Sequence, residues 1–538
     1  MLAMRSTQSE KAITQGRTYT IWFLIFCAHF ILAIYFLSDR ACGTNASVTG
    51  FPLDDTWIHM VYGRSLAEHG LPCYNDGTLE AGFTSPAWLP VLAGAELLAK
   101  TGFASLSIIV KLITVVLASI GGIIIYELCL FISGNRTVSL FAALLFTAHP
   151  LNAFSQLSGM EVNLTGMLIA AGCLAFVRES YRAIGILCGM AYLSRPESVV
   201  IIPVFLVFSL FRETENESCI RLSRPSRLFR IAFPVIISVV LWSTYCFFVT
   251  GHPLPNTYYA KFHADINLIS VLSVIREILR EMTPFKWIGG GIIYLLGVFM
   301  ICKRWKSLGF LLVIVPWIYA ISTGLSRLLP PESGSYFYWW RYWAPIVLLF
   351  AIPFSQGFLS LLSGIRDGSE LYDNKNHPRL VLLLVAAGIT IGPYLSDIPS
   401  FSHTFSWNCR NINEVQVALG QWIDENAGQE EAVIVNDAGA IRYFGRRKTI
   451  DLLGLNNHKI LFSSSRGSSF RMDADKFLDL SRENNAYYLI IFPAWARSLV
   501  FNKIFIKEYE PLLFFESENY TIAPGKVQSR MFIFKRKD

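Results

Sequence analysis

Residues 21–37 read IWFLIFCAHFILAIYFL, and a short polar stretch later residues 51–62 read FPLDDTWIHMVY. The first segment approaches the roughly 20 apolar residues that an α-helix needs to cross a membrane. The second places two adjacent carboxylates, Asp54 and Asp55, just beyond that crossing. A cleaved signal peptide is the alternative, but the run is long for a signal, and SDRACGTNAS at 38–47 offers no clear small-residue cleavage site. We expect an uncleaved first span with a cytoplasmic N-terminus.

The composition extends this interpretation to the whole chain. Of its 538 residues, 53% are hydrophobic and 16% are charged, whereas soluble proteins carry roughly a quarter charged residues. Repeated apolar runs of helix-spanning length then predict a polytopic α-helical membrane protein. The net charge of +7 is explained by basic residues that fix orientation, so we expect no nucleic-acid partner.

The apolar runs predict about eleven spans and a division into two domains. Residues 1–396 would form the membrane domain, with 39–105 as its first outer loop and 81–100 as a juxtamembrane helix. Residues 397–538 look soluble, because the helix signal at 410–426 is followed by strand-like segments at 430–439, 486–492 and 529–538. We expect a small extracytoplasmic α/β domain there. The predicted spans are 20–38, 106–132, 137–152, 161–177, 183–194, 197–211, 229–249, 287–302, 308–323, 343–361 and 380–396.

The cysteines and histidines give few signals. Most of the ten cysteines lie in apolar runs, where they behave as small buried hydrophobes. Cys42 and Cys73 would face an oxidising compartment, so a disulfide between them is one alternative and two free thiols the other. The nine histidines show no metal-ligand spacing, and no structural zinc is expected.

The acidic pair opens a segment with helical periodicity that runs to about His69. One interpretation is structural, since Asp is favoured at a helix N-cap and its charge suits the helix dipole. The other follows from Trp57, Met60 and Val61, which give the helix an apolar face that could lie on the bilayer surface. An ionised carboxylate at the mouth of a membrane cavity can take a proton from an alcohol.

The same loop resembles the first outer loop of the GT-C glycosyltransferases, polytopic enzymes that use polyprenyl-phosphate-linked sugars. It reads DDTWIHMVYGRSLAEHGL from Asp54 and continues with GFTSPAW at 82–88. The arabinofuranosyltransferases of bacterial cell-wall arabinan, which are the most similar group, carry DDxxIxxRYxxxLxxGxGL and then a GYTxPxW-like element. Met60 stands where an aromatic residue is common, and Val61 replaces the usual Arg before Tyr62.

Further motifs follow in the order that the family has them. They are SGME at 158–161, YLSRPE at 192–197, GHPLPNTYYAK at 251–261, RYWAP at 341–345, DAG at 437–439 and DLLGL at 451–455. They are similar to the family's SGxE, LxRPE, GxPLPNTxYAK, RYxxP and DxGxxxY…DxxGL patterns. Each motif is weak alone, but their order over most of the chain supports the superfamily.

The resemblance implies roles for individual residues. Asp54 would be the catalytic base, with Asp55 as its helper or as a sugar contact. Cationic donors would hold the leaving phosphate. The substrate-binding candidates are Glu161, Arg195, His252, Asn256, Tyr259, Lys261, Arg341 and Tyr62. Their structural alternatives are a helix cap for Glu161, a turn-stabilising Arg195, interfacial residues for His252 and Lys261, and an aromatic-belt anchor for Arg341.

The function implied is transfer of one sugar, arabinofuranose by resemblance, from a polyprenyl phosphate to a hydroxyl of a periplasmic envelope acceptor. No metal ligand is expected, although some relatives use a divalent cation. The partners would be the lipid-linked donor, an envelope glycan or glycoprotein, and lipids of the bacterial inner membrane. Alternatives are a protein O-glycosyltransferase acting on pilin, a lipid-linked sugar flippase or transporter, and a non-catalytic envelope scaffold. Transporters usually show inverted repeats and midplane ionisable residues, and neither is recognisable in this sequence.

Overall fold

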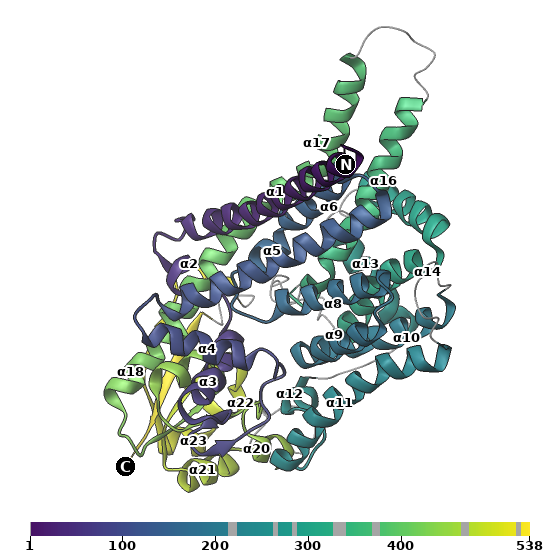
Figure 1. Ribbon diagram of the computed structural model, residues 1–538. Helices are drawn as coiled ribbons and strands as arrows, with labels where there is room; N and C mark the ends of the chain where they lie inside the picture. The colour runs from purple at the N-terminus through teal and green to yellow at the C-terminus, as the bar shows by residue number, and fades with distance from the viewer. Residues whose placement is uncertain are drawn as a thin grey trace.

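The computed structural model describes residues 2–212, 223–261, 267–281, 288–326, 341–367, 377–463, 473–522 and 529–537. A bundle of long helices occupies most of it, and a small mixed sheet with short helices is attached at one end (Figure 1). The expected fold class, a polytopic helical membrane protein with a small C-terminal α/β domain, is confirmed.

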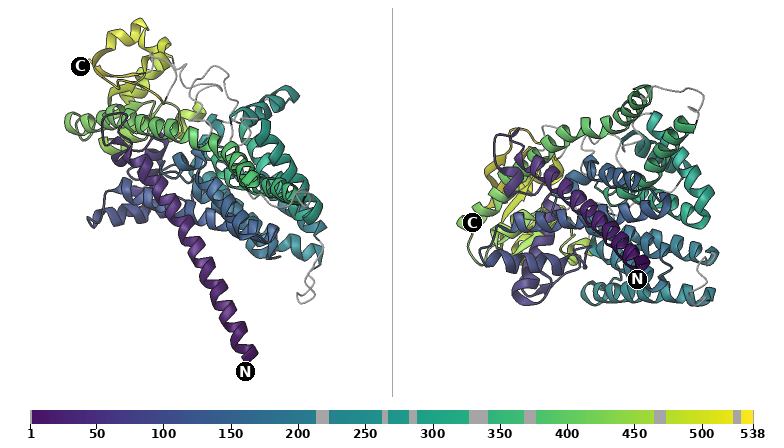
Figure 2. Two further views of the ribbon diagram at one scale, coloured as in Figure 1. Left: turned by 90° about the horizontal axis from the view of Figure 1, so that it is seen from above. Right: turned by 45° about the horizontal axis from the view of Figure 1, so that its top comes forward.

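The membrane region is formed by helices joined through short outer elements. These are α1 (Leu2–Ser38), α2 (Ala46–Thr49), α3 (Asp54–His69), β1 (Cys73–Asn75), β2 (Thr78–Leu79), α4 (Leu89–Lys100), α5 (Leu106–Ser133), α6 (Arg136–Thr147), α7 (Pro150–Ser155), α8 (Val162–Val177), α9 (Tyr181–Ser194), η1 (Pro196–Ile201), α10 (Ile202–Phe211), α11 (Arg224–Thr250), α12 (Asn256–Lys261), α13 (Leu268–Glu281), α14 (Ile288–Ser326), η2 (Ala344–Ile346), α16 (Val347–Asp367) and α17 (His377–Ile412). The N-terminal end of α1 projects away from the bundle (Figure 2).

Five helices among the described residues are long and apolar enough to cross a membrane. They cover Thr18–Ser38, Leu106–Ser133, Arg224–Thr250, Gly289–Ser326 and Ala344–Leu361. Lys306 interrupts α14 with φ 38° and ψ −109°, so this element contains the two helices expected at 287–302 and 308–323. The remaining expected spans fall in the shorter helices α6, α8, α9 and η1–α10, and within α17.

The C-terminal domain is built on a five-stranded sheet in the order β4-β3-β5-β7-β6. β3 pairs in parallel with β4 and β5, while β7 is antiparallel to β5 and β6. The helix and strand signals expected from the sequence are present, and β4 and β6 are additional. The elements are the π-helix η3 (Asn413–Val417), α18 (Ala418–Asn426), β3 (Ala432–Val435), α19 (Ala440–Gly445), β4 (Thr449–Asp451), α20 (His458–Ser463), α21 (Ala474–Glu483), β5 (Ala486–Ile491), η5 (Pro493–Trp495), α22 (Arg497–Val500), α23 (Lys503–Glu508), β6 (Tyr509–Glu516) and β7 (Arg530–Arg536).

The two regions are joined closely. Helix α17 runs through residue 397 without a break, so no flexible linker separates the predicted domains. The first outer loop also packs on the C-terminal domain, because α3 contacts α19 as well as α4. The outer loop therefore places the acidic pair where the sheet domain meets the helical bundle.

The apolar face of α3 does not lie on lipid as expected. Trp57 is 4% exposed and Met60 is fully buried. The Trp57 ring centroid lies 4.8 Å from that of Phe444 and 4.9 Å from that of Tyr443, both on α19. The expectation of a helix resting on the bilayer by this face was wrong, because the C-terminal domain covers the face instead.

The cysteine alternatives are settled in favour of free thiols. Both Cys42 and Cys73 are buried and unbridged. The Cys42 sulfur lies 2.9 Å from the hydroxyl of Ser406 on α17, whereas Cys73 is in the β1–β2 hairpin. A disulfide between these two cysteines is therefore absent.

Candidate active site

The acidic pair begins α3, but Asp54 does not cap that helix. Leu53 occupies the N-cap position in an extended conformation, and Asp54 and Asp55 are the first two helical residues. The carboxylate of Asp54 instead meets the start of α19 in the C-terminal domain. The amide N–H of Gly439 donates to its Oδ2 at 2.9 Å, and the amide N–H of Ala440 donates to its Oδ1 at 2.8 Å.

These two hydrogen bonds give Asp54 a structural task. Both oxygens are engaged, and the side chain ties the first outer loop to the C-terminal domain. Burial, together with the charges of Asp437 and Asp55, raises the pKa of Asp54 well above its usual range despite the two amide donors. The role of catalytic base that the resemblance gives Asp54 stays a prediction, and the geometry favours its neighbour.

Asp55 points the other way, toward two cations of the membrane region. Its Oδ2 accepts a hydrogen bond from Arg341 at 2.6 Å and lies 3.8 Å from the Nζ of Lys261. Asp55 keeps 22% of its side chain exposed, whereas Arg341 is 4% exposed. The Asp55 carboxylate therefore remains accessible to a ligand, whereas the Arg341 side chain is buried.

The electrostatic balance keeps Asp55 ionised. Burial alone would raise the pKa of Asp55, but the charges of Lys261 and Arg341 and the hydrogen bond from Arg341 outweigh it. The resulting pKa lies well below the usual range of an aspartate. Asp55 is thus ionised at any physiological pH.

A second ion pair lies beside the first. The Nε of Arg195 is 3.4 Å from Oε1 of Glu161, and both side chains are at least 95% buried. Arg195 also donates to the backbone carbonyl of Arg341 at 3.4 Å and stacks over the ring of Tyr342, with 5.0 Å from its guanidinium carbon to the ring centroid. These contacts connect the turn after α9 to the segment that begins at residue 341.

The two ion pairs line one cavity. Five predicted site residues face it together, from α3, the start of α8, the turn after α9, α12 and the segment at 341. The cavity is lined by Asp55, Ile58, His59, Gly82, Thr84, Met160, Glu161, Arg195, Glu197, Thr257, Lys261, Arg341, Tyr342 and Leu455. Leu455 comes from the C-terminal domain, so that domain closes one side.

Two further predicted residues lie in a buried polar network next to the cavity. The Tyr62 hydroxyl donates to the side chain of Asn456 at 3.0 Å. Asn256 donates to Glu80 at 3.2 Å and to the carbonyl of Leu455 at 3.1 Å. Both residues are fully buried and hold the loops together, so the structure does not place them in the cavity wall.

The last two predicted residues form an aromatic cluster with α20. The His252 ring stacks on Phe462 with centroids 3.8 Å apart, and Tyr259 lies 5.3 Å from each of these rings. This cluster fixes α12 against the C-terminal domain. It thereby supports Lys261, the residue of α12 that reaches Asp55.

Sequence reasoning missed five polar residues of the cavity, which are His59, Thr84, Glu197, Thr257 and Tyr342. His59 follows Asp55 by four positions and therefore lies on the same face of α3, a spacing that could have been noticed. Burial lowers the pKa of His59, so the imidazole is neutral. Thr257 lies inside the GHPLPNTYYAK motif but gave no chemical signal of its own.

Metal ligation gains no support from these side chains. Among the residues that the structure describes, no group of three His, Cys, Asp or Glu side chains is arranged to hold a metal ion. The carboxylates of the cavity instead face Arg195, Lys261 and Arg341.

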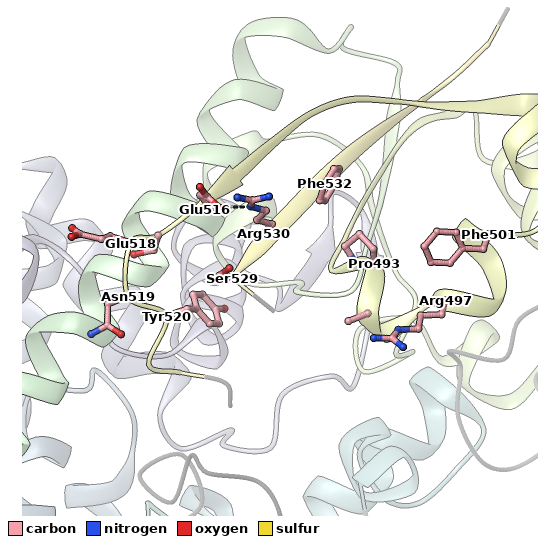
Figure 3. A pocket seen from close by; sticks show the side chains of 12 residues that line it. Pro493, Arg497, Phe501, Glu516, Glu518, Asn519, Tyr520, Ser529, Arg530 and Phe532 are labelled. Carbon is pink, nitrogen blue, oxygen red and sulfur yellow. Dashed lines mark hydrogen bonds and ion pairs between the residues drawn. The ribbon is translucent and has the colours of Figure 1, made fainter. Parts of the chain in front are cut away.

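A larger hollow lies on the C-terminal domain, between the β6–β7 pair and the η5–α22 segment (Figure 3). Phe501 and Phe532 contribute aromatic surface, and an ion pair joins Glu516 to Arg530. None of the ten predicted site residues lines it.

The architecture matches solved structures across nearly the whole chain. The archaeal oligosaccharyltransferase AglB from Archaeoglobus fulgidus, solved with an inhibitory peptide and a dolichol-phosphate, gives a TM-score of 0.59 at 12% identity, over 96% of this chain and 74% of that one. ArnT from Cupriavidus metallidurans gives 0.56 at 13% identity in its apo state, over 96% and 98%. ArnT bound to undecaprenyl phosphate gives 0.53 at 13% identity, over 95% and 98%.

The chain has the GT-C fold. Identities this low establish the arrangement of helices and not the substrates. The GT-C fold agrees with the resemblance drawn from the motifs of the first outer loop. Residues 410–530 also match a family described as "Domain of unknown function (DUF8728)", which covers most of the C-terminal domain. No curated protein matches the chain.

Proposed function

We propose that the protein is a membrane glycosyltransferase that moves one sugar from a polyprenyl phosphate to a hydroxyl of an acceptor outside the cytoplasm. The observation that carries this proposal is the ionised Asp55 held between Arg341 and Lys261 in a cavity that also contains the Glu161–Arg195 pair. The cavity thus combines a carboxylate base with cations suited to a phosphate.

The cations of the cavity suit a phosphate ligand. Arg195 and Lys261 stand 3.4 Å and 3.8 Å from their carboxylates, and a guanidinium carries five N–H donors. A sugar-linked phosphate entering the cavity would accept hydrogen bonds from them, and these bonds would strengthen as negative charge develops on the leaving oxygen.

The proposed reaction uses Asp55 as the base. It accepts the proton of the acceptor hydroxyl while the acceptor oxygen forms a bond to the anomeric carbon. The bond from that carbon to the phosphate oxygen breaks, and the phosphate leaves with the electron pair. Because the donor phosphate draws Arg341 and Lys261 toward itself, it weakens their hold on Asp55 and raises the basicity of that carboxylate. The inverting course is the one for which this base is required.

Two comparisons support a lipid phosphate as the donor carrier. AglB was solved with a dolichol-phosphate and ArnT with undecaprenyl phosphate. Arabinofuranose is our proposed sugar, because the loop from Asp54 to Leu71 resembles that of arabinofuranosyltransferases. The bacterial inner membrane, with the acidic pair on the periplasmic side, is the proposed location.

An envelope glycan is the proposed acceptor, and a protein acceptor is the second candidate. The AglB structure supports a protein as the second candidate acceptor, because AglB has the same fold and was solved with an inhibitory peptide bound. Mass spectrometry of surface glycans and glycoproteins from a deletion strain separates the two.

The experiment compares strains that carry wild type, the deletion, and the deletion complemented with Asp55→Asn. We expect the deletion and Asp55→Asn strains to lack the same sugar from the same acceptor. Restoration of that sugar by Asp55→Asn would refute the catalytic proposal. An unchanged envelope in the deletion strain, with wild-type levels of every surface sugar, would refute the proposed function.

A further inference from the structure

Leaving the arginine side chains aside, three polar atoms of the cavity wall have no hydrogen-bond partner among the described residues. They are Nδ1 of His59, Oε2 of Glu161 and Oγ1 of Thr257, and all three are buried. Their residues come from α3, the start of α8 and α12, and all three line the same cavity. Buried polar atoms are nearly always paired in folded proteins, so three in one wall indicate a ligand that pairs with them.

The chemistry of these atoms defines what they can bind. The free oxygen of Glu161 accepts a hydrogen bond and needs an O–H or N–H donor. The neutral imidazole of His59 offers one donor and one acceptor, and the Thr257 hydroxyl can do both. A sugar ring suits all three, because each of its hydroxyl groups both donates and accepts.

The charges of the cavity favour an uncharged ring. Its lining carries three acidic side chains, Asp55, Glu161 and Glu197, and three basic ones, Arg195, Lys261 and Arg341. The charges therefore balance before any ligand enters, and Glu161 already faces Arg195 through its other oxygen. A neutral hydroxylated sugar adds hydrogen bonds without adding an unpaired charge.

We propose that His59, Glu161 and Thr257 form the subsite for the ring hydroxyls of a neutral donor sugar and determine which sugar is accepted. The inference rests on the proposed function and deepens it. The phosphate would be held by Arg341 and Lys261, which lie with Asp55, and by Arg195, whose partner is Glu161, so among the three subsite residues Glu161 is the one ion-paired to a phosphate-binding cation.

Equilibrium binding in lipid nanodiscs tests the subsite with three probes: undecaprenyl phosphate, polyprenyl-phosphate arabinofuranose and polyprenyl-phosphate mannose. Thr257→Val removes one hydroxyl at nearly constant shape, and Glu161→Gln removes the charge and replaces one acceptor with a donor. Thr257→Ser restores the hydroxyl. Tyr126→Phe is the matched control, because the Tyr126 hydroxyl is also buried without a partner among the described residues but lies outside the cavity.

We expect wild type to bind one sugar-bearing lipid more tightly than undecaprenyl phosphate. Thr257→Val should weaken binding of that lipid about fivefold and Glu161→Gln about tenfold to thirtyfold. Neither variant should weaken binding of undecaprenyl phosphate, since Glu161→Gln removes a negative charge beside the cation Arg195. Thr257→Ser and Tyr126→Phe should behave as wild type. Three results would overturn the inference: equally weakened binding of all three lipids, unchanged binding in both cavity variants, or no preference of wild type among the lipids.

The two proposals fail in different ways. If sugar transfer depends on Asp55 while Thr257→Val and Glu161→Gln bind every probe as wild type does, the subsite is wrong and the enzyme assignment stands. If wild type binds none of the three lipids and transfers no sugar, the proposed function itself is refuted.

Discussion

Gly439 is one of the two residues of α19 and its N-cap that donate a hydrogen bond to Asp54. A Cβ added there would lie 2.2 Å from the backbone oxygen of Asp54 and 2.8 Å from its Oδ1. Ordinary carbon contacts begin near 3.4 Å, so Gly439→Ala must move α19 and the start of α3 apart by about 1 Å. Because φ at Gly439 is −91°, the alanine would not be forced into the left-handed region.

This displacement has two consequences that can be estimated. It breaks or lengthens the two amide hydrogen bonds to Asp54, each worth about 0.5–1.5 kcal/mol. It also shifts Asp55, the next residue, relative to Arg341. A misplacement of about 1 Å can cost roughly 100-fold in rate, so we expect a loss of that order from a residue outside the cavity.

The assay measures the initial rate of sugar transfer by purified protein in nanodiscs, together with limited proteolysis of the C-terminal domain. Gly94→Ala in α4 is the matched control, because a Cβ at that position meets nothing within 4 Å. Gly439→Ala should be slow and more readily cleaved, and Gly94→Ala should match wild type. A wild-type rate for Gly439→Ala would refute the view that the C-terminal domain positions the acidic pair.

Three other predictions concern charge and orientation. Arg341→Met removes one of the two cations that lower the pKa of Asp55, the other being Lys261. We expect kcat/KM to stay flat from pH 8 to 5 in wild type and to fall on acidification in the variant, and superimposable profiles would contradict this. Burial raises the pKa of Asp437 to about 6, above the roughly 3.9 of an ordinary aspartate. The contribution of Asp437 to stability is therefore present below about pH 4 and is lost as pH rises through 6. The thermal midpoint should therefore drop over that window in wild type and less in Asp437→Asn, and equal drops would count against it. A cysteine at exposed Thr78 should react with an impermeant thiol reagent applied outside, while one at exposed Ser180 should not, and the reverse pattern would invert our topology.

Much of the fold follows from local sequence signals. Apolar runs such as 106–132 are long and continuous, and the helix there covers Leu106–Ser133. Two strands were not predicted because their sequence signals are weak. β4 has only three residues, and β6 contains Pro511 next to an irregularity in its pairing with β7. An edge strand tolerates proline there because its outer amides need no partner, and sequence patterns cannot reveal that an edge is available.

The sequence predicted only part of the site. Motif order indicated Asp55, Glu161, Arg195, Lys261 and Arg341, and the structure brings these five residues to one cavity. The division of labour within the acidic pair was not predictable, since a helix turn of about 100° sends adjacent side chains to different partners. Only the folded chain shows that the first carboxylate meets α19, a contact that joins residues 385 positions apart.

The contact partner of α3 was hidden for the same reason. An apolar stripe of Trp57 and Met60 indicates that this face is buried, but it does not identify the surface that covers the face. Apolar residues are favoured equally by a lipid surface and by a protein surface. Here the aromatic rings of α19 provide it.

Transfer from a defined donor tests the central claim most directly. Purified protein in nanodiscs is given polyprenyl-phosphate arabinofuranose labelled in the sugar, with an envelope glycan extract as acceptor, and release of polyprenyl phosphate is measured with the label in the product. We predict stoichiometric release and labelling by wild type and a loss of about 100-fold to 10,000-fold in Asp55→Asn, with donor binding retained. Equal turnover by Asp55→Asn and wild type would contradict the assignment of Asp55 as the reacting base.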